Sequence, residues 1–212
     1  MKKAARSFYA LPDLGSGHRA RVFRRLLAEA VQLVRRGRIP SVAEVAERAG
    51  VSRATAYRYL PSRSKLVSAV IAEALGPVRR AVPQAGDAKQ RLHELLDRTY
   101  SRFADYEPHM RAALQLALEH QSLEAAGLLQ EEPFRRGQRT EILATTLAPL
   151  RRRLKPRTYR RLLQALAVVY GIEPMIILKD ICKATDRETE AVVRWMMDAL
   201  IDAALRESRS RV

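Results

Sequence analysis

Residues 40–66 read PSVAEVAERAGVSRATAYRYLPSRSKL, and this stretch predicts two short helices joined by a tight turn. Ser41 and Glu44 have the spacing of a capping box, in which each side chain accepts a hydrogen bond from the other residue's backbone N–H. Gly50 can end the first helix with a positive φ, and Ser52 can cap a second helix two residues later. Because the turn is too short for parallel packing, the second helix must cross the first. The stretch therefore predicts a helix-turn-helix.

The second of these helices carries side chains that suit the major groove of DNA. Hydrogen-bond donors and aromatic rings recur along it, and both can reach base edges and phosphates. Ala54 and Ala56 leave room for a close approach of the backbone. The alternative is that the tyrosines pack beneath the helix and the arginines form an ordinary solvated face. The side chains concerned are Arg53, Thr55, Tyr57, Arg58 and Tyr59.

Residues 49–66, AGVSRATAYRYLPSRSKL, closely resemble the DNA-binding signature of the TetR family of transcriptional regulators. The resemblance covers about the first 75 residues well, and a looser one continues in YGIEPMIILKDIC at residues 170–182. The sequence departs from the family pattern at Ala54, Ala56, Leu60, Arg63 and Ser64. Ala56 and Leu60 are smaller than the residues that the family usually has there, which implies a slightly smaller core beneath the reading helix.

The resemblance also implies roles for individual residues. It places Arg53 and Thr55 at base edges, and it places Ser41, Tyr57, Tyr59 and Arg63 at phosphates. The complete DNA-binding surface that we predict comprises Ser41, Ser52, Arg53, Thr55, Tyr57, Arg58, Tyr59, Arg63 and Lys65.

The positive charge of the chain is concentrated around this motif. The 212 residues carry a formal net charge of +16. The first 80 residues hold 17 Lys and Arg against 5 Asp and Glu, whereas the rest of the chain holds 22 against 18. Because neutralising phosphates releases condensed counterions, a domain with this excess of cations is expected to bind double-stranded DNA.

A basic amphipathic helix is predicted ahead of the motif, over residues 19–36. Its apolar face and its opposite row of arginines resemble a helix that lies on a membrane surface. However, a helix-turn-helix needs a third helix to cover its apolar side, and this segment supplies one. We therefore expect DNA rather than a membrane as the partner.

The whole chain predicts an all-α fold, since apolar residues recur at helical spacing and no convincing alternating strand is present. With 47% hydrophobic residues and only 9 glycines the chain should be globular. Helices are expected near residues 18–36, 42–49, 53–59, 63–80, 87–107, 109–121, 122–130, 134–152, 158–182 and 186–206. The expected domains are a flexible basic tail at 1–17, a three-helix DNA-binding domain with a connecting helix at 18–80, and a helical ligand-binding and dimerisation domain at 87–207.

The last two predicted helices expose more apolar surface than one protomer can easily cover. Polar residues form a single stripe from Arg187 onward, and the preceding segment is apolar nearly all round from Leu162 to Leu178. Two such helices from each of two subunits would form a four-helix interface, an arrangement that the family resemblance also implies. The alternative is that they form the core of a monomer. The predicted homodimer interface comprises Val193, Met196, Met197 and Leu200.

Polar side chains interrupt the apolar stripes of four predicted helices, as the anchors of a small-molecule pocket do. A kink expected at Pro174 would free the carbonyl of Tyr170 beside that pocket. Glu173 favours a neutral or cationic, mostly apolar effector, and Arg139 keeps an acidic effector as the alternative. Each anchor can also be a satisfied polar group of the core. The predicted effector site comprises Thr99, Tyr100, Gln121, Thr146, Tyr170 and Glu173.

Signals for catalysis are weak. The sequence contains no GxxxxGK[ST], HExxH or GxSxG motif, and its four histidines lack metal-ligand spacing. We expect no metal, no cofactor and no enzymatic activity. The N-terminus lacks an apolar signal core, and the lone Cys182 excludes an internal disulfide, which fits a reducing cytoplasm. We expect this cysteine to be buried.

These observations predict a cytoplasmic, homodimeric transcriptional regulator, acting as a repressor, that binds a palindromic operator and is released by a small-molecule effector. Two alternatives from other classes remain. One is a constitutive DNA-organising protein without an effector, and the other is an enzyme that acts in the C-terminal cavity.

Overall fold

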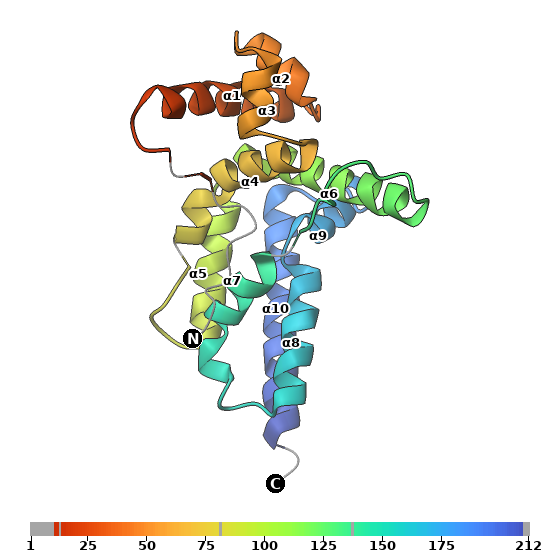
Figure 1. Ribbon diagram of the computed structural model, residues 1–212. Coiled ribbons are helices and arrows are strands. Elements are labelled where there is room, and N and C mark those ends of the chain that lie inside the picture. The colour runs from red at the N-terminus through yellow and green to blue at the C-terminus, as the bar shows by residue number, and fades with distance from the viewer. Residues whose placement is uncertain (1–10, 13, 81, 137, 210–212) are drawn as a thin grey trace. The chain divides into compact units, whose positions relative to one another are not determined.

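The computed structural model describes residues 11–12, 14–80, 82–136 and 138–209, and these residues form helices and no strand (Figure 1). The predicted all-α class is thereby confirmed. Two compact units are present: Met1–Gly76 with Ala104–Arg136, and Pro77–Phe103 with Gly137–Val212. The predicted tail at 1–17 lies largely outside the described residues.

The first unit contains the helix-turn-helix and the helices that support it. Its core joins the apolar sides of the N-terminal helices to Ala112, Leu116 and Phe134 from later in the chain. This packing explains why the unit includes residues beyond position 104. The compact units do not test whether the chain divides into independently folding domains, so the domain boundary predicted near residues 80–87 stays a prediction. The helices are α1 (His18–Arg35), α2 (Val42–Arg48), α3 (Arg53–Tyr59), α4 (Arg63–Arg80, to Gly76 in this unit) and α6 (Phe103–Ala125, from Ala104 in this unit).

The predicted caps define the helix-turn-helix. The Ser41 hydroxyl accepts from the N–H of Glu44 at 3.1 Å. The Glu44 carboxylate pairs with Arg38 instead, at 2.9 Å, so we find only the serine half of the expected capping box. Gly50 has a φ of 59°, the left-handed conformation that glycine adopts without strain. The Ser52 hydroxyl then caps α3 by accepting from the N–H of Thr55 at 3.3 Å.

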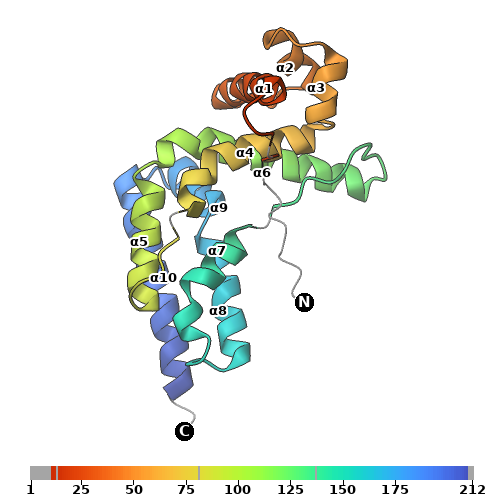
Figure 2. The ribbon, with the colours of Figure 1, turned by 60° about the vertical axis from the view of Figure 1, so that its left-hand side comes forward.

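The second unit consists of helices packed lengthwise. Its first helix begins with a complete capping box between Asp87 and Gln90. The last helix packs on α8 and on α5, and α8 lies beside it in two views (Figures 1 and 2). The elements are α5 (Ala88–Tyr100), α7 (Gln138–Thr146), the 3-10 turn η1 (Ala148–Leu150), α8 (Pro156–Val169), α9 (Ile172–Ile176), the π-helical turn η2 (Ile177–Ile181) and α10 (Asp186–Arg209).

Pro108 does not end a helix, which corrects the sequence prediction. The helix before it, α5, already ends at Tyr100, and Ser101 and Arg102 form the turn. The next helix, α6, runs from Phe103 to Ala125 with Pro108 inside it, where two shorter helices were expected. A proline inside a helix removes one hydrogen bond, and burial of neighbouring apolar residues can offset that loss.

The long helix predicted over residues 158–182 is broken at Tyr170 and Gly171. Gly171 has a φ of 155°, and α9 restarts at Ile172. Pro174 is therefore the third residue of a new helix, where its missing N–H needs no partner within the helix. The kink predicted at Pro174 is wrong. Cys182, directly after η2, is exposed rather than buried as expected.

Among the described residues, no single helix is long and apolar enough to span a membrane. Taken together, α8 and the α9–η2 segment have the length and apolar composition of a membrane span, but they are bent by 41° relative to each other.

Candidate nucleic-acid interface

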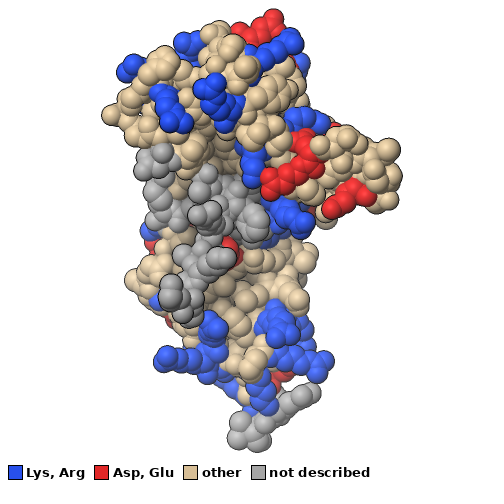
Figure 3. All heavy atoms as spheres, in the orientation of Figure 1, with Lys and Arg blue, Asp and Glu red and all other residues tan. Residues whose placement is uncertain are grey.

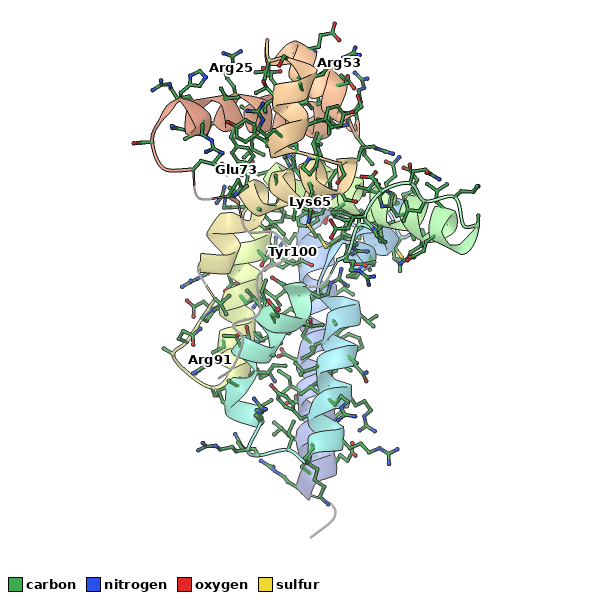
Figure 4. The ribbon with its side chains drawn as sticks, viewed as in Figure 1. Arg25, Arg53, Lys65, Glu73, Arg91 and Tyr100 are labelled. Carbon is green, nitrogen blue, oxygen red and sulfur yellow. The ribbon has the colours of Figure 1, made fainter. Side chains whose placement is uncertain are left out.

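The outer face of α3 carries most of the side chains predicted to contact DNA. Arg53 and Arg58 are exposed, and Tyr57 is 46% exposed, which is high for a tyrosine ring. Thr55 is half-buried, and its hydroxyl lies 2.9 Å from that of Ser52. Figure 4 shows Arg53 extending from the end of this helix. The arrangement leaves donors and an aromatic ring free to meet a ligand.

The opposite face of α3 is tied into the core of the first unit. Ala56 and Leu60 are buried there. The ring of Tyr59 is half-buried and packs against Phe23 of α1, with 6.1 Å between the ring centroids. Tyr59 thus packs beneath the helix, which is the alternative given above for the tyrosines. Its contact with phosphate stays a prediction.

Arg25 of α1 holds the turn between α2 and α3, a role that sequence reasoning missed. Its Nε donates to the carbonyl oxygen of Ala49 at 3.0 Å, and its Nη2 donates to that of Gly50 at 3.1 Å. These carbonyls belong to the end of α2, where no intrahelical donors remain. On sequence grounds Arg25 was one of several arginines on the polar face of this helix, and nothing in its spacing distinguished it.

The two cations predicted at the start of α4 are already paired within the first unit. Arg63 makes two hydrogen bonds to Glu119 of α6, and Lys65 pairs with Glu132 at 2.9 Å. The hydrogen bond from Arg63 lowers the pKa of the Glu119 carboxyl. Figure 3 shows Lys and Arg side chains spread over α1 to α3, with acidic side chains near the C-terminal end of α6.

All nine predicted DNA-binding residues lie in the first unit, within one segment from Ser41 to Lys65. Residues 26–70 match the family model of bacterial regulatory proteins, tetR family. The helix-turn-helix belongs to the TetR family. No curated protein and no solved structure matches the chain. The match to a TetR DNA-binding domain makes this chain a DNA-binding transcriptional regulator.

Four of the predicted effector residues lie in the second unit, and their side chains have partners there. The hydroxyls of Thr99 on α5 and Tyr170 at the end of α8 lie 3.0 Å apart. Tyr100 donates to the sulfur of Met175 at 3.0 Å, and Glu173 pairs with Arg139 at 2.6 Å. Burial raises the pKa of both Tyr100 and Tyr170, so both phenols stay protonated.

The other two predicted effector residues are placed differently. Thr146 is fully buried in the second unit, and its hydroxyl donates to the carbonyl of Ile142 in the preceding turn. Gln121 belongs to the first unit and is exposed, so the expectation that it interrupts an inward apolar stripe is wrong. Gln121 lies near the C-terminal end of α6.

Two of the cavities among the described residues bear on where a small molecule could bind, one in each unit. One of about 590 Å³ lies in the first unit between residues 11, 12, 14 and 15, α1 and Glu73. A groove of about 80 Å³ lies between α8 and α10, with Ala165 and Leu200 in its walls. Neither cavity is lined by a predicted effector residue, and the described residues hold no cluster of three or more metal-ligating side chains.

The predicted dimer residues divide into two pairs. Val193 and Met197 are completely buried within the second unit, so the structure corrects their assignment to an interface. Met196 and Leu200 are half-buried. The exposed side of α10 instead presents Trp195, which is 70% exposed. Among the described residues of this unit, the other large apolar side chains that are exposed are Val168, Ile177, Ile181 and Val192.

Proposed function

We propose that this regulator is a cytoplasmic, homodimeric repressor that binds a palindromic operator and is released by a small-molecule effector. The observation that carries the proposal is the exposed face of α3, where Arg53, Tyr57 and Arg58 face outward from a helix capped by Ser52. Arginine can form two hydrogen bonds to guanine in the major groove, and such pairs discriminate between bases.

Dimerisation is supported by the apolar surface that α8 and α10 leave exposed. A monomer rarely leaves an indole such as that of Trp195 mostly in water, because covering it with a partner removes a large apolar area. A second copy would place its own α8 and α10 against this surface and so form a four-helix interface. Two reading heads would then be linked, as a palindromic site requires.

An effector site in the second unit is supported by the polar cluster of Thr99, Tyr100 and Tyr170. Thr99 and Tyr100 belong to α5 and Tyr170 follows α8, and their hydroxyls bond to one another or to Met175. The ion pair between Arg139 and Glu173 neutralises both charges. A neutral aromatic ligand is therefore favoured over a charged one, which would have to compete with that pair.

Selection of bound duplexes from a random pool tests the proposal. We expect the full-length protein to enrich a palindrome whose half-sites lie about one helical turn apart, with two protomers per duplex. Binding at physiological salt without preference for any sequence would favour the constitutive DNA-organising protein. Chemical turnover of a bound small molecule would favour the enzyme.

A further inference from the structure

Three carboxylates of the first unit surround the N-terminus of α4, and we call Glu119, Glu131 and Glu132 the acidic clamp. Glu119 meets the guanidinium of Arg63 through two hydrogen bonds of 2.7 and 3.2 Å. Glu132 lies 2.9 Å from the ammonium of Lys65. In this arrangement both cations at the start of α4 have carboxylate partners from the same chain.

The third carboxylate binds the backbone of α4. Glu131 accepts from the N–H of Ser64 at 3.2 Å, and the Ser64 hydroxyl donates to the carbonyl of Glu132 at 2.7 Å. The first N–H groups of a helix lack partners within the helix, and the positive end of the helix dipole lies there. Glu131 therefore occupies a position that favours any oxyanion.

A buried histidine holds the clamp in place. His120 of α6 is 2% exposed, and its Nδ1 accepts from the N–H of Phe134 at 3.1 Å. An Nδ1 that accepts leaves the ring proton on Nε2, which lies 3.3 Å from Glu131. The loop after α6 is thus attached to its helix at Phe134 and at Glu131. This attachment keeps the three carboxylates beside α4.

Phosphate oxygens of DNA would bind the same groups, namely the Arg63 guanidinium and the Ser64 N–H. Arginine binds carboxylate and phosphate with the same fork of two parallel hydrogen bonds, so one fork cannot hold both at once. A phosphate that approaches Arg63 or the Ser64 N–H must displace Glu119 or Glu131. The loss of each carboxylate contact reduces the net gain from binding DNA.

We propose that the acidic clamp is an intramolecular competitor of DNA, in which Glu119, Glu131 and Glu132 take the positions that phosphate oxygens occupy in the complex. The proposal rests on the proposed function, because it requires that Arg63 and Lys65 contact DNA phosphates. Arg63 and Glu119 keep 32% and 37% of their side-chain surface exposed, so the competition is moderate rather than absolute. Ion pairs of this exposure correspond to a change of about 1.4- to 5-fold in an equilibrium constant.

The test compares two charge-neutralising variants of the full-length protein on a labelled duplex of random sequence. Glu119→Gln keeps the shape of the side chain and frees Arg63. Glu124→Gln is the matched control, because Glu124 is exposed on the same helix and its removal changes the net charge equally. We expect Glu119→Gln to bind DNA about 2- to 5-fold more tightly than Glu124→Gln at low salt, and we expect the ratio to shrink as salt screens the pair.

The Arg63→Ala background separates the possible failures. In that background Glu119→Gln should no longer tighten DNA binding, because the Arg63 side chain for which Glu119 and phosphate compete is gone. Equal affinities of Glu119→Gln and Glu124→Gln, or weaker binding by Glu119→Gln with an unchanged thermal midpoint, would overturn the competition. If Arg63→Ala itself leaves DNA affinity unchanged, the phosphate contact of the proposed function fails and the competition fails with it.

Discussion

The guanidinium of Arg25 donates to the carbonyl oxygen of Ala49, with 3.0 Å between Nε and the oxygen. A second bond runs to the carbonyl of Gly50. One side chain of α1 thereby fixes the end of α2 and the turn that sets the angle of α3. The orientation of the reading helix depends on a residue that lies outside the helix-turn-helix itself.

Replacing Arg25 should destabilise the first unit. Arg25→Ala leaves the Ala49 carbonyl without its charged donor, and bonds of this kind contribute about 1.5–3 kcal/mol when well formed. Because the site is partly exposed, we expect a loss of about 1–2 kcal/mol in the free energy of unfolding. Urea denaturation followed by circular dichroism measures it. Arg21→Ala, at an exposed position of the same helix, is the control, and an equal loss there would contradict the role of Arg25.

Substitutions on α3 and α4 should differ in their dependence on DNA sequence. Arg53→Ala should cost about 1–3 kcal/mol on the selected palindrome and little on random duplexes, because base contacts carry specificity. Arg63→Ala should weaken binding to both duplexes and lower the salt slope by about one. Fluorescence anisotropy at several salt concentrations gives both quantities. Equal losses on both duplexes for the two variants would refute these roles.

A charge at Trp195 should separate the protomers. Trp195→Glu places a carboxylate in the apolar surface of α8 and α10, where a partner would have to desolvate it. We expect monomers at micromolar concentration in light scattering, and much weaker binding to the palindrome since the two heads are no longer linked. Leu118→Glu introduces the same charge at an exposed leucine of the first unit and should leave the dimer intact. A wild-type protein that is monomeric would contradict the interface.

Effector response should depend on the polar cluster of the second unit. For a compound that releases the operator, Tyr100→Ala or Glu173→Ala should abolish release and leave operator affinity nearly unchanged. The coupling that is lost should correspond to about 5- to 150-fold in affinity, since allosteric linkage is reciprocal. Gln121→Ala is the control, because Gln121 is exposed in the first unit. If both cluster variants stay fully responsive, the effector binds elsewhere.

His109 should make stability depend on pH. This residue of α6 is buried, and burial lowers its pKa below the ordinary value of 6.5, with backbone contacts to Val31 and Asp105 opposing the shift. The native ring is therefore neutral, and the unfolded chain binds the extra proton. Stability is fully present above the unfolded pKa and falls as the pH drops below it.

Replacing His109 should remove this contribution. Between about pH 7 and pH 5, His109→Gln should show a smaller slope of unfolding free energy against pH than the wild type. His18→Gln, at an exposed position, should keep the wild-type slope. An unchanged slope in His109→Gln would show that another group causes the dependence.

Much of the first unit could be predicted from sequence because its signals are local. The bounds of α3 and the caps at Ser41 and Ser52 follow from residues within four positions of one another. The polar residues that hold these helices were not predictable in the same way. Arg25 acts on residues 24 positions away, and the partner of Arg63 lies 56 positions away. Such contacts depend on tertiary packing, which helical periodicity does not encode.

In the second unit the local signals themselves gave wrong positions for the helix ends. Pro108 was expected to end one helix and Pro174 to kink another, yet the helices are interrupted at Ser101 and at Gly171. The guanidinium of Arg139 lies so close to Gly171 that an added Cβ would be 2.6 Å from it. Arg139 also donates to the carbonyl of Ala167 near the end of α8. Here a distant side chain, rather than the local sequence, marks the place where the helix stops.

The acidic clamp is covalently part of the chain that it acts on, since Glu119 and Arg63 belong to the same protomer. A tethered carboxylate has an effective concentration that is set by the fold and not by the amount of protein. Diluting or overproducing the protein leaves the occupancy of Arg63 unchanged. A reduction in DNA affinity that arises in this way is the same at every expression level, and a separate acidic partner protein could not provide that constancy.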